Sequence, residues 1–411
     1  MPKTKKKHHH SDQQKQLNAQ QNNEFLNKLR NLFKSIVGED IFRFIPSNDY
    51  KLLIYGRARP IIAVSEEGHS IPPKIIEAIQ KLINYYIKKV TMPAETSQKP
   101  VSIIDFYTTG LTFSAYCCYL ESIDVKYKNA DQVIALISNS NLELGKQFDI
   151  LYDKLIDQLF PFLIQTTNSF WEGYYSYRFN ISNSDGIVGF QYQVVVKQYK
   201  PEKQKFLLSD NVRPAFRIGW TFKDNAFEWL YLLASELGIK SLPKDQQIPV
   251  YIQSHAIQRI FERLDCIHRY VLISSIYLSL RKGACIKERG KFIIEFVILN
   301  VKVGYLSAVM IDGKLVIRTF LFLTFNGTPE GKRLEDFIGL KALDTKYLRM
   351  DKLSSFMTGK LKENEELRSI FEKADCLHLV ELYDKLDQFS AVHPDHSPVE
   401  MLARYLETER N

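Results

Sequence analysis

A short run of polar residues near the middle of the chain has the side-chain types that phosphodiester chemistry uses. His255, Arg259, Glu262 and Arg263 fall on one face of an expected helix that runs from His255 to about Leu264. Cleavage of RNA without a metal needs a base for the 2′-hydroxyl, an acid for the leaving 5′-oxygen, and cations around the phosphorane. His255 could be the base or the acid, and the two arginines could hold the phosphate.

A second element adds one notable charge, Arg318, in an otherwise apolar strand expected over Leu315 to Thr324. Strict alternation puts Arg318 on the same side as Val316, Phe320 and Phe322, so it projects from an exposed face or is paired there. A buried arginine needs a carboxylate, a phosphate or water, because an unpaired buried charge is costly. The candidate catalytic set is His255, Arg259, Glu262 and Arg318.

The same residues have plainer interpretations. The polar helix face can be an ordinary solvated surface, since Arg259 and Glu262 are spaced to form a surface ion pair. Arg318 can be paired structurally with Glu262 or Glu295. Thr328 and Pro329 indicate a helix start, which caps the helix and could also bind phosphate. The candidate nucleic-acid-binding residues are Arg263, Lys291, Lys302, Tyr305, Lys332 and Arg333.

The helices and strands that must position these residues can be predicted from the sequence as one module. Ser254 is a good N-cap for the first helix, and a more apolar helix follows over Ile267 to Lys282. Strands are expected over 292–299, 302–311 and 315–324, and Asp312-Gly313 is a strong hairpin signal between the last two. Two helices followed by an antiparallel meander predict an α+β layer with helices on one face of a sheet.

The run Ser254-His255-Ala256, followed by Arg259 and Glu262-Arg263, resembles the helix of RelE- and BrnT-type toxin domains. The order helix, helix, meander is also similar to that fold. The resemblance covers about 80 of the 411 residues. It implies a metal-independent ribonuclease, ribosome-dependent or free, with His255, Arg259 and Arg318 in the site, or a retained fold that only binds. RNA is favoured over DNA as the partner.

Charge is unevenly distributed along the chain. The whole protein carries a net charge of +8, but residues 248–333 alone carry +7, whereas residues 334–411 carry −5. A concentrated basic segment favours a polyanion, because neutralising phosphates with Lys and Arg drives nucleic-acid affinity. An ordinary basic surface, or one that meets an acidic protein in a non-enzymatic scaffold, explains the same numbers.

The length and the pattern of elements predict a multi-domain α+β protein. Residues 1–22 are polar and Gln-rich and are expected to be a disordered tail, followed by an N-terminal α+β region over 23–247. The basic module spans 248–333, after a polar loop at Lys240–Pro249, and an acidic helical segment spans 334–411. A helix is also expected from Asn225 to Leu237, ending at Gly238.

Several classes of protein are disfavoured by what the sequence lacks. The five cysteines form no C-x-x-C pair, so no metal site and no disulfide framework is expected, and reduced thiols fit a cytoplasmic protein. The N-terminus has no apolar signal region, and no window is apolar enough to span a membrane. No P-loop, dinucleotide fingerprint or zinc-protease motif occurs, so no cofactor is expected.

Overall fold

The computed structural model describes most of the chain in two compact units. It covers residues 5–92, 101–138, 153, 155–183, 190–208, 211–222, 226–282, 284–288, 290–338, 350–356, 365–379 and 382. The first unit comprises residues 1–163, 176–197 and 223–225, and the second comprises 164–175, 198–222 and 226–411. Both units contain helices and strands, which confirms the α+β class.

The first unit is largely helical. Its main helices are α1 (Lys5–Val37), α2 (Tyr50–Tyr55), α3 (Pro73–Lys89), α5 (Leu111–Ser122) and α6 (Ala130–Ser138). Strand β1 (Arg59–Ser65) pairs in parallel with β5 (Phe190–Tyr199), whose other neighbour is β4 (Tyr174–Asn183). Helix α1 begins well inside the segment expected to be disordered, because Gln, Lys, Leu and Ala are good helix formers and no Gly or Pro intervenes before Gly38.

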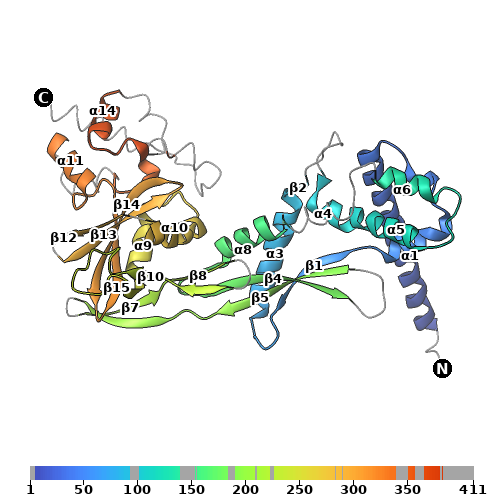
Figure 1. The fold of residues 1–411 in the computed structure, drawn as a ribbon, viewed down its shortest axis with the longest axis horizontal. Helices are drawn as coiled ribbons and strands as arrows, with labels where there is room; N and C mark the ends of the chain where they lie inside the picture. Colours follow the sequence, from blue (N-terminus) through green and yellow to red (C-terminus); the bar gives the residue numbers. More distant parts are fainter. Residues whose placement is uncertain are drawn as a thin grey trace. The chain divides into compact units, whose positions relative to one another are not determined.

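The second unit is built on one large mixed sheet (Figure 1). The strand order is β12-β13-β14-β15-β11-β7-β6, and β10 also pairs with β11. The strands are β6 (Lys203–Leu208), β7 (Asn211–Arg217), β10 (Tyr231–Leu233), β11 (Gln247–Gln253), β12 (Cys285–Glu288), β13 (Lys291–Ile298), β14 (Val301–Ile311) and β15 (Lys314–Phe322).

The predicted helices and meander are confirmed, but the N-cap of the first helix is Gln253 and not Ser254, which is the first residue of the helix itself. Helix α9 (Ser254–Arg263) follows β11 directly, and α10 (Arg269–Lys282) follows α9. The hairpin between β14 and β15 turns at Asp312 and Gly313, whose φ values of 49° and 73° are those of the expected left-handed turn. Both helices pack against the sheet, α9 against β15 and α10 against β13 (Figure 1).

The two faces of this sheet differ. Leu306, Ala308, Ile317 and Phe320 point to what we call the helix face and join the main core with α9 and α10. The opposite side, which we call the pocket face, carries Tyr251, Val316 and Val309, which belong to a separate small cluster with Phe206 and Ala215. Residues paired across neighbouring strands share a face, so this division runs consistently across β14, β15 and β11.

A β-bulge changes the expected position of Arg318. Ser307 pairs with Thr319, but the next residue, Ala308, pairs with Ile317, so Arg318 is an extra residue in β15. The alternation that grouped Arg318 with Phe320 and Phe322 is therefore wrong, since the bulge resets the alternation. Val316 and Arg318 share the pocket face, whereas Phe320 and Phe322 lie in the main core.

Two other expectations differ from the structure. The segment predicted as a helix from Asn225 to Leu237 instead forms β9 (Phe227–Trp229), β10 and a turn, because its aromatic residues pair with neighbouring strands. The boundary loop at Lys240–Pro249 lies inside the second unit, since β6, β7 and β10 join the same sheet as β11. The part of the predicted acidic helical segment that follows residue 382 lies outside the described residues.

Candidate anion-binding site

A pocket of about 340 Å³ lies on the pocket face of the second unit's sheet. Four basic side chains line it, each from a different element. They are Arg213 from β7, His255 from the first turn of α9, Lys291 from β13 and Arg318 from the bulge in β15. The structure therefore brings together His255, Arg318 and Lys291 from the predicted set, and adds Arg213.

The pocket has an uncompensated positive charge. No carboxylate is among its described lining residues, which are completed by Gln253, Ser307, Val309 and Thr319. Within the part of the chain that the structure describes, none of the four basic side chains has an ion pair or a side-chain hydrogen bond. Arg318 is thus not paired with Glu262 or Glu295 there. Converging cations without a counter-charge are suited to an anion.

His255 is tuned toward its neutral form. Burial lowers the pKa of His255 below its usual 6.5, and the nearby positive charges of Arg259 and Arg213 lower it further, while Glu262 acts in the opposite direction. The imidazole is therefore neutral at pH 7 and can accept a proton. It is the only described lining group of a type that titrates near neutrality.

Three neutral polar residues in the pocket escaped prediction. Gln253 ends β11 immediately before α9, and only 3% of it is exposed. Its amide nitrogen Nε2 has no hydrogen-bond partner among the described residues. Ser307 and Thr319 face each other across β14 and β15 and add two hydroxyls. No local pattern marks these residues, because their convergence depends on strand register.

The remaining predicted residues of α9 lie apart from the lining set. Arg259 Nη1 donates to Glu262 Oε2 at 3.0 Å, so these two form the surface ion pair that their spacing allowed. The guanidinium of Arg263 stacks on the ring of Phe325, 5.6 Å from its centroid, and burial lowers its pKa. The catalytic set predicted from sequence thus divides, with His255 and Arg318 in the pocket and Arg259 and Glu262 outside its lining.

Three further candidates form a buried charge cluster around Glu330. Only 2% of Glu330 is exposed. Its Oε1 accepts hydrogen bonds from Lys302 Nζ at 2.8 Å and Tyr305 Oη at 2.9 Å, and Arg333 Nη2 lies 3.8 Å away. Burial lowers the pKa of Lys302, but the hydrogen bond and charge of Glu330 outweigh this effect and raise it. Burial and Glu330 together raise the pKa of Tyr305 to about 12.

The same cluster anchors the C-terminal segment. Arg333 Nε donates to the carbonyl oxygen of Ala374 at 3.1 Å, and His378 Nε2 lies 2.8 Å from the carbonyl oxygen of Lys302. Helix α11 (Pro329–Ile338) is capped by Thr328, whose Oγ1 accepts from the Gly331 amide at 3.0 Å, which confirms the predicted cap. Lys332 is exposed on α11 and does not line the pocket.

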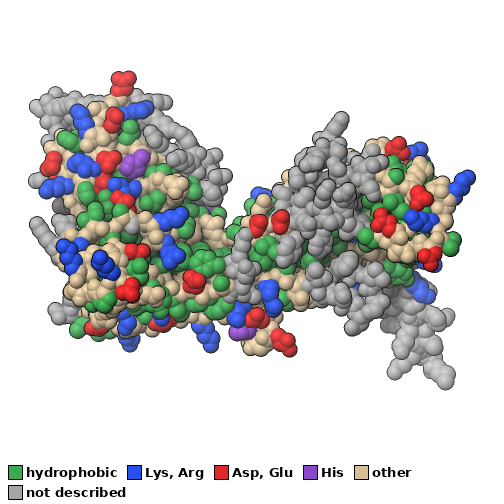
Figure 2. Space-filling model, viewed as in Figure 1, with side chains coloured by type: hydrophobic (Ala, Val, Ile, Leu, Met, Phe, Trp, Pro, Cys, Tyr) green, Lys and Arg blue, Asp and Glu red, His purple; other side chains and the backbone are tan. Residues whose placement is uncertain are grey.

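Outside the pocket, charge on the second unit is mixed. Figure 2 shows basic side chains dispersed over the strands labelled β12 to β15, with acidic side chains among them. The excess of +7 in residues 248–333 therefore does not form one continuous basic surface on the face in view. In the pocket, by contrast, the described lining residues include four basic side chains and no carboxylate.

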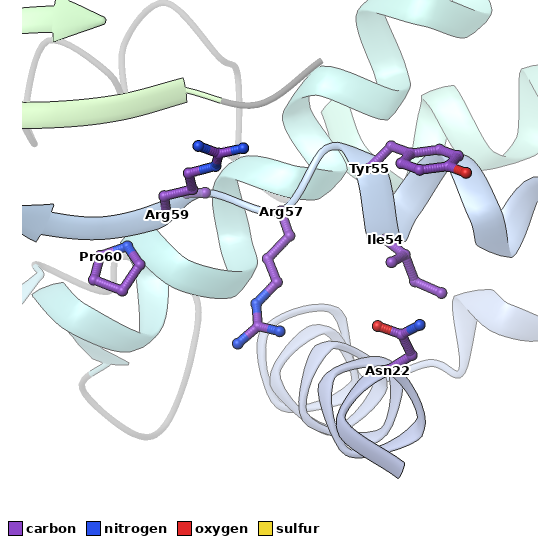
Figure 3. Close-up of a pocket in the computed structure, with 7 residues that line it drawn as sticks. Asn22, Ile54, Tyr55, Arg57, Arg59 and Pro60 are labelled. Atoms are coloured by element: carbon purple, nitrogen blue, oxygen red, sulfur yellow. The ribbon is translucent and has the colours of Figure 1, made fainter. Parts of the chain in front are cut away.

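A second pocket of about 320 Å³ lies in the first unit, next to Asn22, Ile54, Arg57 and Arg59. Figure 3 shows the side chains of Arg57 and Arg59 pointing in different directions from the segment that leads into β1. The guanidinium of Arg57 stacks on Phe25, 5.0 Å from the ring centroid. These two charges do not converge on one point, so the pocket is a weaker candidate for binding an anion.

Among the described residues, no group of three or more His, Cys, Asp or Glu side chains is placed to hold a metal ion. No helix in the described part of the chain is both long and apolar enough to cross a membrane. All five cysteines are free thiols.

In comparisons with known proteins, the chain matched no protein-family model, no curated protein and no solved structure. The pocket and its neighbouring elements are therefore the basis for a functional proposal.

Proposed function

We propose that the second unit binds nucleic acid, RNA in preference to DNA, by seating a phosphate in the pocket on its sheet. One observation carries the proposal: Arg213, His255, Lys291 and Arg318 converge from four elements with no carboxylate among them. Phosphate contacts from Lys and Arg supply most of the affinity of such interfaces. The proposed preference for RNA over DNA is based on the resemblance of the α9 segment to RelE-type domains. We also propose a cytoplasmic location, which the five free cysteines fit.

Metal-independent cleavage would proceed through His255. Neutral His255 would take the proton from a 2′-hydroxyl, whose oxygen would attack phosphorus and release the 5′-oxygen, leaving a 2′,3′-cyclic phosphate. The leaving 5′-oxygen must gain a proton, and the described lining residues offer no second group of a type that titrates near neutrality. This composition supports binding more strongly than cleavage.

Binding is tested by titrating a single-stranded RNA into the full chain at several salt concentrations. Arg318→Glu should weaken binding by about tenfold or more and flatten the salt dependence, because one phosphate contact is lost and a repulsion is gained. Lys240→Glu is the matched control, since it makes the same charge change in an exposed loop of the same unit. Equal losses in the two variants, or none in either, would contradict the proposal.

The same RNA, incubated with the protein in EDTA, separates binding from chemistry. Accumulation of a cyclic-phosphate product that disappears in His255→Ala would assign cleavage to the pocket. Binding without any product would leave a recognition module.

A further inference from the structure

Gln253 is the most informative residue in the pocket, because it is buried without the partner that its amide requires. Only 3% of its surface is exposed, and Nε2 has no hydrogen-bond partner in the described chain. A buried amide donor that is left unsatisfied destabilises the folded protein. A ligand bound in the basic pocket that Gln253 lines would supply the missing acceptor.

The surroundings of Gln253 define what that ligand must be. Gln253 pairs with Ala215 on β7 and is also the N-cap residue of α9. Its side chain forms no capping hydrogen bond, and the first turn of α9 contains no acidic residue. The first amides of a helix lack intrahelical partners and favour an anion. Gln253 Nε2, the hydroxyls of Ser307 and Thr319, and the cations of Arg213, Lys291 and Arg318 can all donate hydrogen bonds, and only the hydroxyls and Gln253 Oε1 can also accept. A ligand rich in acceptor oxygens matches this excess of donors.

The charge of the pocket favours a dianion over a monoanion. Three side chains carry a fixed positive charge, and His255 can add a fourth, with no carboxylate among the described lining residues. An internal phosphodiester carries one negative charge, whereas a phosphate monoester carries about 1.5 to 2 at pH 7 and presents three terminal oxygens. Each additional negative charge or acceptor oxygen on the ligand therefore strengthens binding more in this pocket than at an ordinary basic surface, because it forms charge-assisted hydrogen bonds.

We propose that this pocket recognises the terminal phosphate monoester of an RNA strand, with Gln253 donating to one of its oxygens. The inference rests on the proposed function and makes it more specific: binding is directed to phosphorylated ends rather than to any backbone phosphate. Gln253 is a binding residue in this proposal, and it has no part in proton transfer.

Calorimetric titration of the full chain with three short RNAs of one sequence tests the proposal. They carry a 5′-phosphate, a 3′-phosphate or hydroxyls at both ends. At least one phosphorylated strand should bind about tenfold more tightly than its hydroxyl twin, the effect of about one charge-assisted hydrogen bond. Inorganic phosphate serves as the fourth ligand and should bind more weakly than the phosphorylated strand.

Two variants connect the preference to Gln253. Gln253→Met has similar volume without the amide, so it should reduce the preference, although the basic side chains that also favour a dianion remain, and it should leave the hydroxyl strand bound within about twofold. Without ligand its melting temperature should equal or exceed that of the wild type, because an unsatisfied donor is removed. Gln258→Met, on the exposed side of α9, is the control and should keep the preference.

The outcomes distinguish this inference from the function on which it rests. Equal binding of all three strands, with loss in Arg318→Glu, would overturn the end preference and leave RNA binding in place. A Gln253→Met protein that melts well below the wild type and keeps the preference would show that Gln253 is structural. Inorganic phosphate that binds as tightly as phosphorylated RNA would make the pocket a free-phosphate site, and the absence of all binding would overturn both proposals.

Discussion

Arg318 and Gln253 are informative for the same reason, which is that each presents donors that the described chain does not satisfy. Arg318 has no ion pair there, and the Gln253 amide nitrogen is buried without a partner. By contrast, Lys302, Tyr305 and Arg333 have the residue types of a nucleic-acid site but contact Glu330. Residue type alone does not separate these two groups, whereas their partners do.

His255 should report occupancy of the pocket through its titration. Its pKa lies below 6.5 in the empty pocket because of burial and its neighbouring arginines. A bound dianion should raise the pKa of His255, so that binding is coupled to uptake of a proton. The affinity should therefore increase as the pH falls through the pKa of His255 in the complex, and it should level off below the pKa of His255 in the ligand-free protein.

Proton NMR of the imidazole with and without phosphorylated RNA measures both values. His268, in the same unit but outside the pocket lining, is the internal control and should not respond to the RNA. An empty-pocket pKa at or above 6.5, or one that the ligand leaves unchanged, would contradict this account.

The bulge in β15 is the element that makes the pocket compatible with the core. Ile317 and Phe320 both lie in the main core although three positions separate them, and regular alternation would place them on opposite faces. The extra residue allows Arg318 and Thr319 both to line the pocket while the strand keeps its apolar residues on the helix face. Bulges are common beside functional sites because they redirect a side chain.

Removing the bulge should separate binding from folding. Deletion of Arg318 leaves Ile317 next to Thr319 and keeps every other residue on its present face, so the protein should unfold cooperatively but lose most RNA affinity. An alanine inserted between Thr319 and Phe320 should instead move Phe320 and Phe322 to the opposite face, at a cost of about 1.5–3 kcal/mol for each.

Chemical denaturation followed by circular dichroism, with RNA titration of each folded variant, measures these effects. A deletion variant that is less stable than the insertion variant would show that the bulge is needed for folding. Retained affinity in the deletion variant would remove Arg318 from the site.

At the scale of the whole molecule, the acidic C-terminal segment is part of the second unit's core. Phe371 of α14 (Glu365–Lys373) is fully buried and lies 5.5 Å from the ring of Phe356, which in turn packs on Phe322 of β15. Asp375 of this segment forms an ion pair with Arg333 of the basic module, with Oδ2 3.4 Å from Nη2. The segment therefore compensates one charge of the basic module, while the described residues that line the pocket include no carboxylate.

Phe371→Ala should destabilise the protein by about 3–5 kcal/mol, because it removes a fully buried aromatic ring from this core. Phe337→Ala, on α11, is the matched control, since 52% of Phe337 is exposed and its loss should cost about 0.5 kcal/mol or less. Urea denaturation of the full chain compares the two. Similar small losses in both variants would indicate that the segment does not belong to the core.

The sequence by itself determined the local elements of the basic module. The spacing of His255, Arg259, Glu262 and Arg263 on one face predicted α9, Asp312-Gly313 predicted the hairpin, and Thr328 predicted the cap of α11. These features depend on residues within a few positions of one another, so local periodicity and turn chemistry are sufficient. Local patterns failed at Phe227–Trp229 and Tyr231–Leu233, which form strands because they pair with residues 219–221 and with β11.

Only the tertiary structure decided the composition of the site. Arg213 reaches the pocket because β7 pairs with β11, and Lys291 does so because β13 joins the same sheet through β14. Of the predicted catalytic residues, His255 and Arg318 line the pocket, and Arg318 does so because of the bulge in β15. Arg259 and Glu262 pair with each other outside the lining. Register is set by contacts between residues far apart in the chain, and no pattern along a single strand contains it.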